Sequence, residues 1–386
     1  MTMASEDKDQ VAAAVRDLAG EIVTLSRRIH GHPELAHQEH SAFAWCREVL
    51  ERHGFEFAPV QGVETAFVAT RHGRGPGPTI GFLAEYDALP EVNHGCGHNL
   101  IAGSAVGAGV FLAGAMSRLP GTIKVYGCPA EEVGTGKPMM LAAGAFAGLD
   151  AALTYHPWHS TAVMERCNGV RIYEFEFHGR PAHAGDGPWN GASALDGVLL
   201  TYTNLNALRQ FTTDGVRIHG IVSDGGQAVN VVPDRAICKI GVRAPQPDEL
   251  ERVCARVLEC AEAGALASAT RLEVREVGFM EPVRYNRALG EVVASNLSAL
   301  GEPVGTWRTA ASTDFGNVSQ AVPAVLFSIA TWPETVAFHT REAAACAITD
   351  QALAAMLTAA HAMADTAVDL LSDASAVQRI REGHGR

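Results

Sequence analysis

The chain has 386 residues, a formal net charge of −13 and a hydrophobic content of 47%. This length allows two domains around a large buried core, and the 19% of charged residues is ordinary for a globular protein. No basic stripe accompanies the acidic balance, which excludes nucleic acid and anionic membranes as expected partners.

The N-terminal segment and the cysteines indicate a cytoplasmic protein. Residues Met1–Gln10 are polar and contain no apolar signal core. The eight cysteines form no paired framework, which in a chain of this size predicts reduced thiols. The longest uncharged apolar stretch, Leu100–Met116, is short and rich in Gly and Ala. We expect it to be a helix buried in an α/β layer rather than a membrane span.

Hydrophobic periodicity predicts two helices at the start of the chain, over Ser5–His30 and Ser41–His53. The first should end before Pro33, because the residue that precedes a proline avoids helical geometry. Helix-like segments then alternate with strand-like runs at Thr65–Thr70, Thr79–Ala84, Thr122–Cys128 and Asp150–Tyr155. This alternation predicts an α/β layer with a mostly parallel sheet.

From Gly169 onward the pattern becomes that of a small α+β domain with the order βαββαβ, a ferredoxin-like split βαβ unit. Its predicted elements are Val170–Phe177, Ala192–Phe211, Val216–Ser223, Val232–Arg243, Pro247–Leu266 and Arg271–Val277. A strand at Pro323–Ile329 and a helix at Ile348–Leu371 follow, and the tail Ser372–Arg386 should be frayed. We therefore predict a catalytic α/β domain, residues 1–169 and 282–386, interrupted by an inserted domain over residues 170–281.

Polar residues follow three successive predicted strands. Glu85 and Asp87 follow the second, Glu131 and Glu132 the third, and His156 the fourth. Ligands bind at the carboxyl ends of strands in open α/β sheets, so these side chains should meet at one edge.

The run His94-Gly95-Cys96-Gly97-His98-Asn99 adds a thiol and imidazoles to that edge. The glycines beside Cys96 let Cys96 and His98 point at one spot, and thiolate, imidazole and carboxylate together suit zinc or a similar divalent ion. A spacing of two residues favours joint metal ligation over a nucleophile and its base.

The adjacent acids Glu131 and Glu132 can have different roles. Their side chains leave the backbone in different directions, so one can bind metal while the other takes a proton from a bound water. The alternative is that both acids favour the N-terminus of the following helix through its dipole. The Gly-Lys pair within Gly134–Lys137 is not a phosphate loop, because Pro138 stands where Ser or Thr is required.

Polar loops of the insert supply further candidates. His183 lies in the turn Gly179–Gly185, although a lone loop histidine is usually a surface residue. Asn230 lies between a flexible loop and a strand, where it could orient a substrate carboxylate or oxyanion. We also assign Arg243 to substrate binding. Near the C-terminus, His339 could supply a last metal ligand.

Together these motifs resemble the metallopeptidase superfamily that contains aminoacylases, carboxypeptidase G and acetylornithine deacetylase. The nearest branch includes indoleacetyl-amino-acid hydrolases and p-aminobenzoyl-glutamate hydrolase. The motifs that carry the resemblance are Ala84–Pro90, His94–Asn99, Pro129–Glu132, Gly179–His183, Asn230–Pro233 and Ser312–Ser319.

The resemblance implies a two-metal site, zinc or manganese, with Cys96 as a bridge; its ligands are Cys96, His98, Glu132, His156 and His339. It further implies that Glu131 is the general base and acid and that Asp87 orients a ligand. His183 and Asn230 are implied as substrate contacts from the lid. The lid histidine reaches the partner subunit's site in the family, which implies a homodimer through the inserted domain.

Three positions depart from the family pattern. Glu85 stands where many members of the superfamily carry histidine, and Asn99 stands where many branch members carry aspartate. His339 stands alone where many members have adjacent histidines, which makes it the weakest of the five ligand assignments.

The predicted function is metal-dependent hydrolysis of a small-molecule amide, an N-acyl or N-aroyl amino acid or a dipeptide-like compound, by a metal-bridging water with Glu131 as base. One alternative is a hydrolytic deaminase of an aromatic amine. Another is a non-catalytic metal-binding protein, although a structural site is usually closed and lacks a spare acid beside it.

Overall fold

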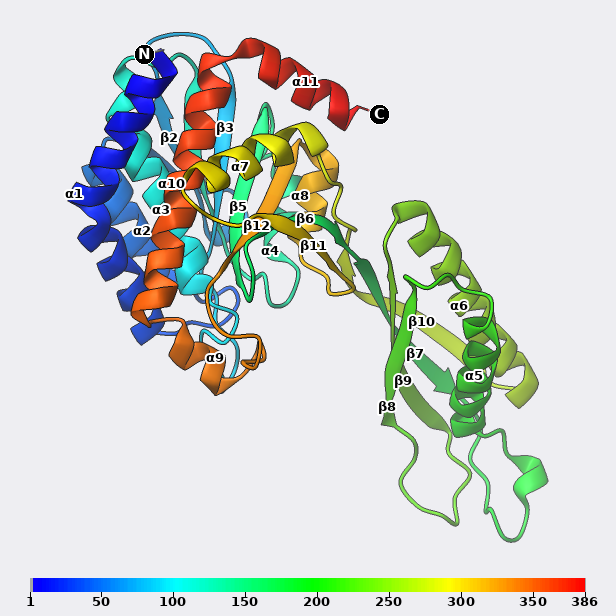
Figure 1. The fold of residues 1–386 in the computed structure, drawn as a ribbon. Coiled ribbons are helices and arrows are strands. Elements are labelled where there is room, and N and C mark those ends of the chain that lie inside the picture. The colour runs from blue at the N-terminus through cyan, green and yellow to red at the C-terminus, as the bar shows by residue number, and fades with distance from the viewer. Residues whose placement is uncertain (1–2, 386) are drawn as a thin grey trace. The chain divides into compact units, whose positions relative to one another are not determined.

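The computed structural model describes residues 3–385, which form two compact units (Figure 1). Unit 1 comprises Met1–Glu165, Arg284–Arg308 and Asn317–Arg386, and unit 2 comprises Arg166–Val283 and Thr309–Gly316. Both ends of the described segment 3–385 therefore lie in unit 1, and most of unit 2 is one continuous insertion.

An eight-stranded sheet with the order β1-β2-β4-β3-β5-β12-β6-β11 forms the centre of unit 1. Its strands are β1 (Glu56–Val60), β2 (Val63–His72), β3 (Thr79–Glu85), β4 (Thr122–Cys128), β5 (Ala151–Trp158), β6 (Ala162–Cys167), β11 (Gly305–Thr309) and β12 (Ala324–Ala330). The four central strands, β4, β3, β5 and β12, run parallel, while β1, β2 and β6 pair antiparallel with their neighbours. The predicted α/β class is confirmed.

Helices cover this sheet, and one of them is buried along its whole length. The helices of unit 1 are α1 (Met3–Gly31), α2 (His40–Arg52), α3 (His98–Ala113), α4 (Gly136–Ala142), α7 (Arg287–Ala299), α8 (Phe315–Ala321), α9 (Arg341–Cys346), α10 (Asp350–Ser372) and α11 (Ala374–His384). Every residue of α3 is buried, as predicted for this apolar stretch. Gly103 and Gly107 allow close approach, since an added Cβ would lie 2.3 Å from Met356 Sδ and 3.1 Å from Ala360 Cβ.

No helix among residues 3–385 has the length and apolar character to cross a membrane. All eight cysteines lie within these residues, and each one is free.

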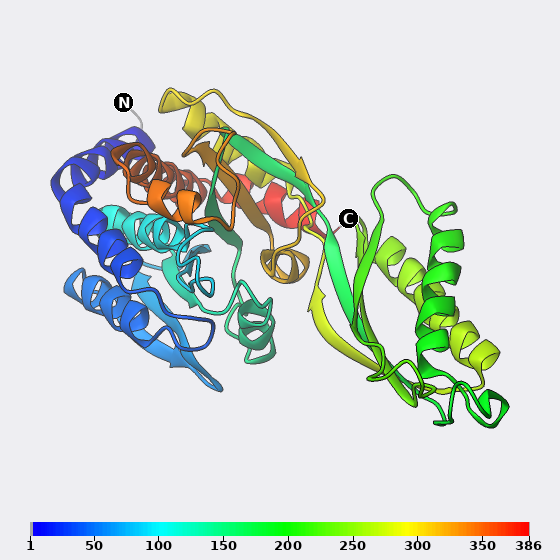
Figure 2. The ribbon, with the colours of Figure 1, turned by 90° about the horizontal axis from the view of Figure 1, so that it is seen from below.

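Unit 2 has the predicted order βαββαβ. Its elements are β7 (Gly169–His178), α5 (Ala194–Arg209), β8 (Arg217–Asp224), β9 (Arg235–Ala244), α6 (Pro247–Ser268) and β10 (Arg271–Met280). The antiparallel sheet has the order β10-β7-β9-β8, and α5 and α6 lie side by side against it (Figure 2). Phe175, Phe177, Val198 and Val257 belong to the apolar core between these layers.

The prediction of a frayed C-terminal tail is wrong. Residues Ala374–His384 form α11, and Asp373 caps it by accepting a hydrogen bond from the Ser375 amide at 2.8 Å. Ala376, Val377 and Ile380 are buried in the core of unit 1. Burial of this apolar stripe offsets the ordering entropy that a chain end otherwise keeps.

Candidate metal centre

The strand ends of β3, β4 and β5 bring the predicted polar residues of unit 1 together. These strands are neighbours in the parallel part of the sheet, so their carboxyl ends open on the same edge. Asp87 follows β3, Glu131 and Glu132 follow β4, and His156 lies near the end of β5. Asp87 is buried, whereas the two glutamates and His156 are partly shielded.

A tight turn before α3 positions Cys96 and His98. Gly97 has φ +80°, a left-handed conformation that glycine adopts without steric cost. A Cβ at this position would also lie 2.8 Å from Pro157 Cγ. Residue 97 must therefore be glycine if the thiol and the imidazole are to lie on either side of it.

Asp87 orients two members of the group at once. His98 Nδ1 donates to Asp87, whose Oδ1 lies at 3.0 Å and whose carbonyl oxygen lies at 2.9 Å. The other carboxylate oxygen of Asp87 accepts from the Glu132 amide at 3.0 Å. Since Nδ1 of His98 is occupied, its Nε2 is the atom left for a ligand.

The side chains of the five predicted ligands and of Glu131 converge in overlapping groups whose donor atoms lie within 4.8 Å of one another. The groups are Cys96, His98 and His156; Cys96, Glu132 and His339; and His98, Glu131 and Glu132. Cys96 Sγ is 3.5 Å from His156 Nε2, and Glu132 Oε2 is 3.6 Å from His339 Nε2. Cys96, His98 and Glu132 each belong to two groups, an arrangement that suits two adjacent cations.

Buried atoms without hydrogen-bond partners mark where a cation fits. Within residues 3–385, His98 Nε2 and Glu132 Oε1 are both buried and both lack a partner. An unpaired buried polar atom costs about 1–3 kcal/mol, and coordination to a cation would remove this cost at both atoms. The mixture of thiol, imidazole and carboxylate suits zinc and similar transition ions.

The electrostatics of the cluster also favour an added cation. Burial raises the pKa of the Cys96 thiol, and the charges of Glu132 and Glu131 add to this effect. Burial and the charge of Glu85 raise the pKa of Glu131 to about 7. Burial lowers the pKa of His156 to about 4, so this imidazole is neutral and able to ligate at neutral pH. A divalent ion would favour the anionic forms of the thiol and carboxylates.

Two backbone positions at the site adopt the left-handed region although they are not glycine. Ala130, just before Glu131, has φ 56°, and His339 has φ 60°. The buried carboxylate of Glu39 accepts from the Ala130 amide at 2.9 Å, and the Gly95 carbonyl accepts from the His339 amide at 3.0 Å. Such conformations persist only where surrounding contacts hold them, and they concentrate at functional sites.

The candidates of the insert, His183, Asn230 and Arg243, belong to unit 2. The loops of His183 and Asn230 pair with each other, since the Ala184 amide donates to the Asn230 carbonyl at 2.9 Å. Both loops lie where β7 ends and β9 begins. Arg243 lies at the opposite end of β9 and donates to Ser312 Oγ at 2.7 Å. Arg243 therefore does not lie with the other two candidates in unit 2.

Two of the three positions that depart from the family pattern, Asn99 and Glu85, have partners in the structure. Asn99 is buried, and its amide donates to Ser26 Oγ and to the Ala347 carbonyl, each at 3.0 Å. It therefore joins α3 to neighbouring segments of the core. Glu85 forms an ion pair with Lys137, whose Nζ is 2.7 Å from Glu85 Oε1.

Sequence reasoning missed a cluster of aromatic rings around His156. The Trp307 and Phe338 rings lie 6.0 and 5.7 Å from the His156 ring, centroid to centroid. Trp158 stacks on Phe338 at 4.8 Å and lies 4.3 Å from Trp307. Trp158 and Phe338 are half-buried. The adjacency of Phe338 to His339 was the one signal in the sequence.

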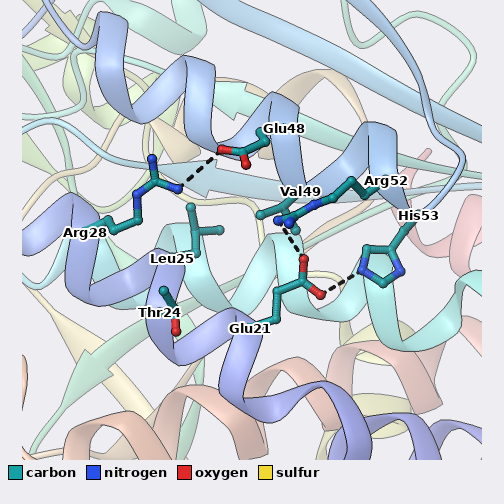
Figure 3. Close-up of a pocket in the computed structure, with 8 residues that line it drawn as sticks. All are labelled: Glu21, Thr24, Leu25, Arg28, Glu48, Val49, Arg52 and His53. Carbon is teal, nitrogen blue, oxygen red and sulfur yellow. Dashed lines mark hydrogen bonds and ion pairs between the residues drawn. The ribbon is translucent and has the colours of Figure 1, made fainter.

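A separate hollow lies between α1 and α2 (Figure 3). None of its lining residues belongs to the donor cluster. Glu21 pairs there with Arg52 Nη2 at 2.8 Å and His53 Nε2 at 2.9 Å, and Arg28 pairs with Glu48 at 3.3 Å. Partly exposed ion pairs of this kind contribute about 0–1 kcal/mol each, so they link the two helices and indicate no catalytic chemistry.

The parallel sheet with its inserted split βαβ unit and its strand-end donors is that of a peptidase-type hydrolase. The chain belongs to peptidase family M20/M25/M40, which matches residues 81–369. It is similar to Xaa-Arg dipeptidase of Homo sapiens, with 33% identity over 396 residues that cover 96% of this chain and 90% of that protein. It is also 33% identical over 301 residues to one of the subunits of p-aminobenzoyl-glutamate hydrolase from Escherichia coli (strain K12), and the match covers 72% of this chain and 62% of that one.

Solved structures show the same fold. A dinuclear metal binding peptidase of the M20 family from Bacillus subtilis has a TM-score of 0.72 and 22% identity, covering 92% of this chain and 99% of that one. The aminobenzoyl-glutamate utilization protein from Klebsiella pneumoniae has a TM-score of 0.73 and 21% identity, covering 93% and 98%. The predicted superfamily and fold class are thus confirmed.

Proposed function

We propose that the chain is a dinuclear metal-dependent amidohydrolase that cleaves the amide bond of an N-acyl or N-aroyl amino acid or a dipeptide-like substrate. The observation that carries this proposal is the position of Glu131 beside the donor cluster, with Oε2 3.8 Å from His98 Nε2. A spare acid next to metal ligands is typical of a catalytic site, whereas a structural site is closed by its ligands.

The proposed ligands of the two ions, zinc or manganese, are Cys96, His98, Glu132, His156 and His339. When bound, the ions would supply Lewis acidity toward the scissile carbonyl and lower the pKa of the attacking water. Asp87 holds His98 and Glu132 in place through the hydrogen bonds described above.

Glu131 carries the proton in this proposal. With cations bound nearby, its carboxylate would be ionised, so it can accept a proton from the attacking water and deliver it to the leaving nitrogen. The C–N bond then breaks, and the products are a carboxylic acid and a free amino acid. Ammonia would be the second product only if the leaving group were an unsubstituted amine nitrogen, as in a deaminase.

The aromatic rings beside His156 support an aroyl or large apolar acyl group on the substrate. The half-buried Phe338 ring lies 5.7 Å from the ring of His156, a proposed ligand, and Trp158 stacks on Phe338, so in this proposal the two rings hold the acyl group of the substrate. Aromatic rings stack on planar groups with offset or edge-to-face geometry. One relative is named for p-aminobenzoyl-glutamate, a compound whose aroyl group agrees with such a surface.

A homodimer formed through unit 2 is part of the same proposal. Strand β8 lies at the edge of its sheet, so one row of its backbone groups is available to a second copy. Ile221 and Val222 on this strand are 62% and 45% exposed. His183 is exposed in the loop that follows β7. Since β7 has ten residues, its two ends lie roughly 30 Å apart. As part of this proposal, we assign His183 to the partner subunit's site.

A substrate screen tests the proposed function. The protein would be stripped with a chelator, reloaded with Zn²⁺ or Mn²⁺, and given p-aminobenzoyl-glutamate, N-benzoyl and N-acetyl amino acids, and Xaa-Arg dipeptides. We expect release of a free amino acid that depends on the added metal. Ammonia release would indicate the deaminase, and unfolding on chelation without any turnover would indicate a structural metal protein.

A further inference from the structure

A lysine that is completely buried pairs with a strand-end carboxylate beside the donor cluster. Lys137, the second residue of α4, has no solvent exposure, and its Nζ lies 2.7 Å from Glu85 Oε1. Glu85 is the last residue of β3 and is 3% exposed. A buried charge requires a partner, so each side chain fixes the position of the other.

Glu85 lies within reach of the proposed metal ligands. Its Oε2 is 3.7 Å from His98 Nε2, while Glu131 Oε2 and Glu132 Oε1 each lie 3.8 Å from the same nitrogen. By distance alone, Glu85 would compete for a cation at His98 as effectively as Glu131 or Glu132. The groups of mutually close donor atoms among residues 3–385 nevertheless contain Glu131 and Glu132 and not Glu85. Lys137 holds one oxygen of Glu85, Oε1, at 2.7 Å, which leaves only Oε2 facing His98.

We propose that Lys137 is a positioning residue of this site, whose ammonium binds Glu85 and so keeps that carboxylate out of the coordination of the metal ions. This inference rests on the proposed two-metal function. With Glu85 withheld, the ligand set remains one thiolate, three imidazoles and one carboxylate. An additional carboxylate would add negative charge to the ions and weaken their polarisation of water and carbonyl groups.

The substitution Lys137→Met removes the ammonium at similar side-chain volume. Released from its partner, Glu85 would join the coordination of the ion at His98 and bind it more tightly. Because coordination number governs the intensity of the visible absorption of Co²⁺, the cobalt-loaded variant should absorb less strongly than the cobalt-loaded wild type. Added metal should also raise its Tm further, since tighter binding to the folded state gives more stabilisation.

Two further variants separate this role from simple packing. Glu85→Gln keeps the shape of the side chain and removes its charge, so it should bind as many Co²⁺ ions per subunit as the wild type and show the same spectrum. The double variant K137M/E85Q should return to that spectrum as well. Lys239→Met serves as a matched control, because Lys239 pairs with Glu174 at 3.4 Å on the exposed sheet of unit 2.

The experiment measures Co²⁺ per subunit, the visible spectrum and the metal-induced rise in Tm for these variants. Loss of an ion in Glu85→Gln would overturn the inference, because Glu85 would then be a ligand. A wild-type spectrum and Tm rise in Lys137→Met would also overturn it, since Lys137 would only fill space. If Lys137→Met does not fold, the ion count and spectrum of Glu85→Gln decide. A wild type that binds no ion would contradict the proposed function itself.

Discussion

Asp87 holds His98 and Glu132 together: its Oδ1 accepts from His98 Nδ1 at 3.0 Å, and its Oδ2 accepts from the Glu132 amide at 3.0 Å. The charge and hydrogen bonds of these partners outweigh the effect of burial and keep the pKa of Asp87 below its usual value. One ionised carboxylate thus fixes the ring of one proposed ligand and the backbone of another.

We expect Asp87→Asn to weaken metal binding by about 10–100-fold, the usual effect of removing a group that orients a metal ligand. The amide can present only one oxygen, so it loses either the His98 contact or the Glu132 contact. Competition with a chromophoric chelator measures the affinity. Asp17→Asn, at an exposed position of α1, is the control. An unchanged affinity in Asp87→Asn would refute this role.

Phe338→Ala should act selectively on substrates with an aroyl group. Loss of one aromatic contact costs about 0.5–1.5 kcal/mol, so kcat/KM should fall by roughly 2–10-fold more for an N-benzoyl than for an N-acetyl amino acid. A disturbance of the metal ligands by the substitution would lower kcat/KM equally for both substrates, so the comparison cancels it. Equal losses for both would show that Phe338 only supports His156 and His339.

Mixed dimers test whether His183 acts in the partner subunit's site. Neither His183→Ala nor Glu131→Gln alone should be active. If His183 serves the partner, heterodimers of the two variants regain one working site. A random equimolar mixture should then reach about a quarter of wild-type activity, since half of its dimers are mixed. A mixture without activity would place His183 in the site of its own subunit.

The stability of the protein should depend on pH through Asp365, which is not one of the proposed site residues. Burial raises the pKa of this carboxyl to about 7, and its Oδ2 lies 3.6 Å from His361 Nε2. An acid whose pKa is raised by folding binds more protons in the folded state, so its contribution falls as pH rises from about 4 to 7. The free energy of unfolding of Asp365→Asn minus that of the wild type should therefore be roughly 1–3 kcal/mol higher at pH 8 than at pH 4.

Urea denaturation at pH 4 and pH 8 measures this difference, and comparison with the wild type cancels the contribution of the metal cluster. Asp17→Asn again serves as the control. A free energy of unfolding for Asp365→Asn that follows the wild type in parallel at both pH values would show that the Asp365 carboxyl is not titrating in this range.

The sequence predicts much of this architecture because its strongest patterns are local. Alternation of helix and strand gives the α/β layer, and polar residues after three strands indicate the edge at which donors meet. The strands β1, β6 and β11 were missed, since the first is short and exposed and the other two depend on pairing with distant segments. The helix α11 was missed because its three buried apolar residues stabilise a helix only when they pack against the rest of the core.

The roles of Lys137 and the aromatic cluster could not be predicted from the sequence. A lysine after glycine in a polar loop is ordinarily solvated, and only the folded chain shows that Lys137 is buried against Glu85. Trp158, Trp307 and Phe338 come from three distant segments. No spacing rule connects such residues, because tertiary packing alone brings them together.

The central claim is that the donor cluster holds two ions and that Glu131 moves the proton. The most direct measurement is the metal content and turnover of Glu131→Gln beside the wild type, on a substrate identified by the screen. We predict two ions per subunit in both proteins and a fall in kcat of about 10²–10⁴-fold in the variant, the usual contribution of general acid–base catalysis. Near-normal turnover in Glu131→Gln, or a wild type that turns over substrate without bound metal, would contradict the account.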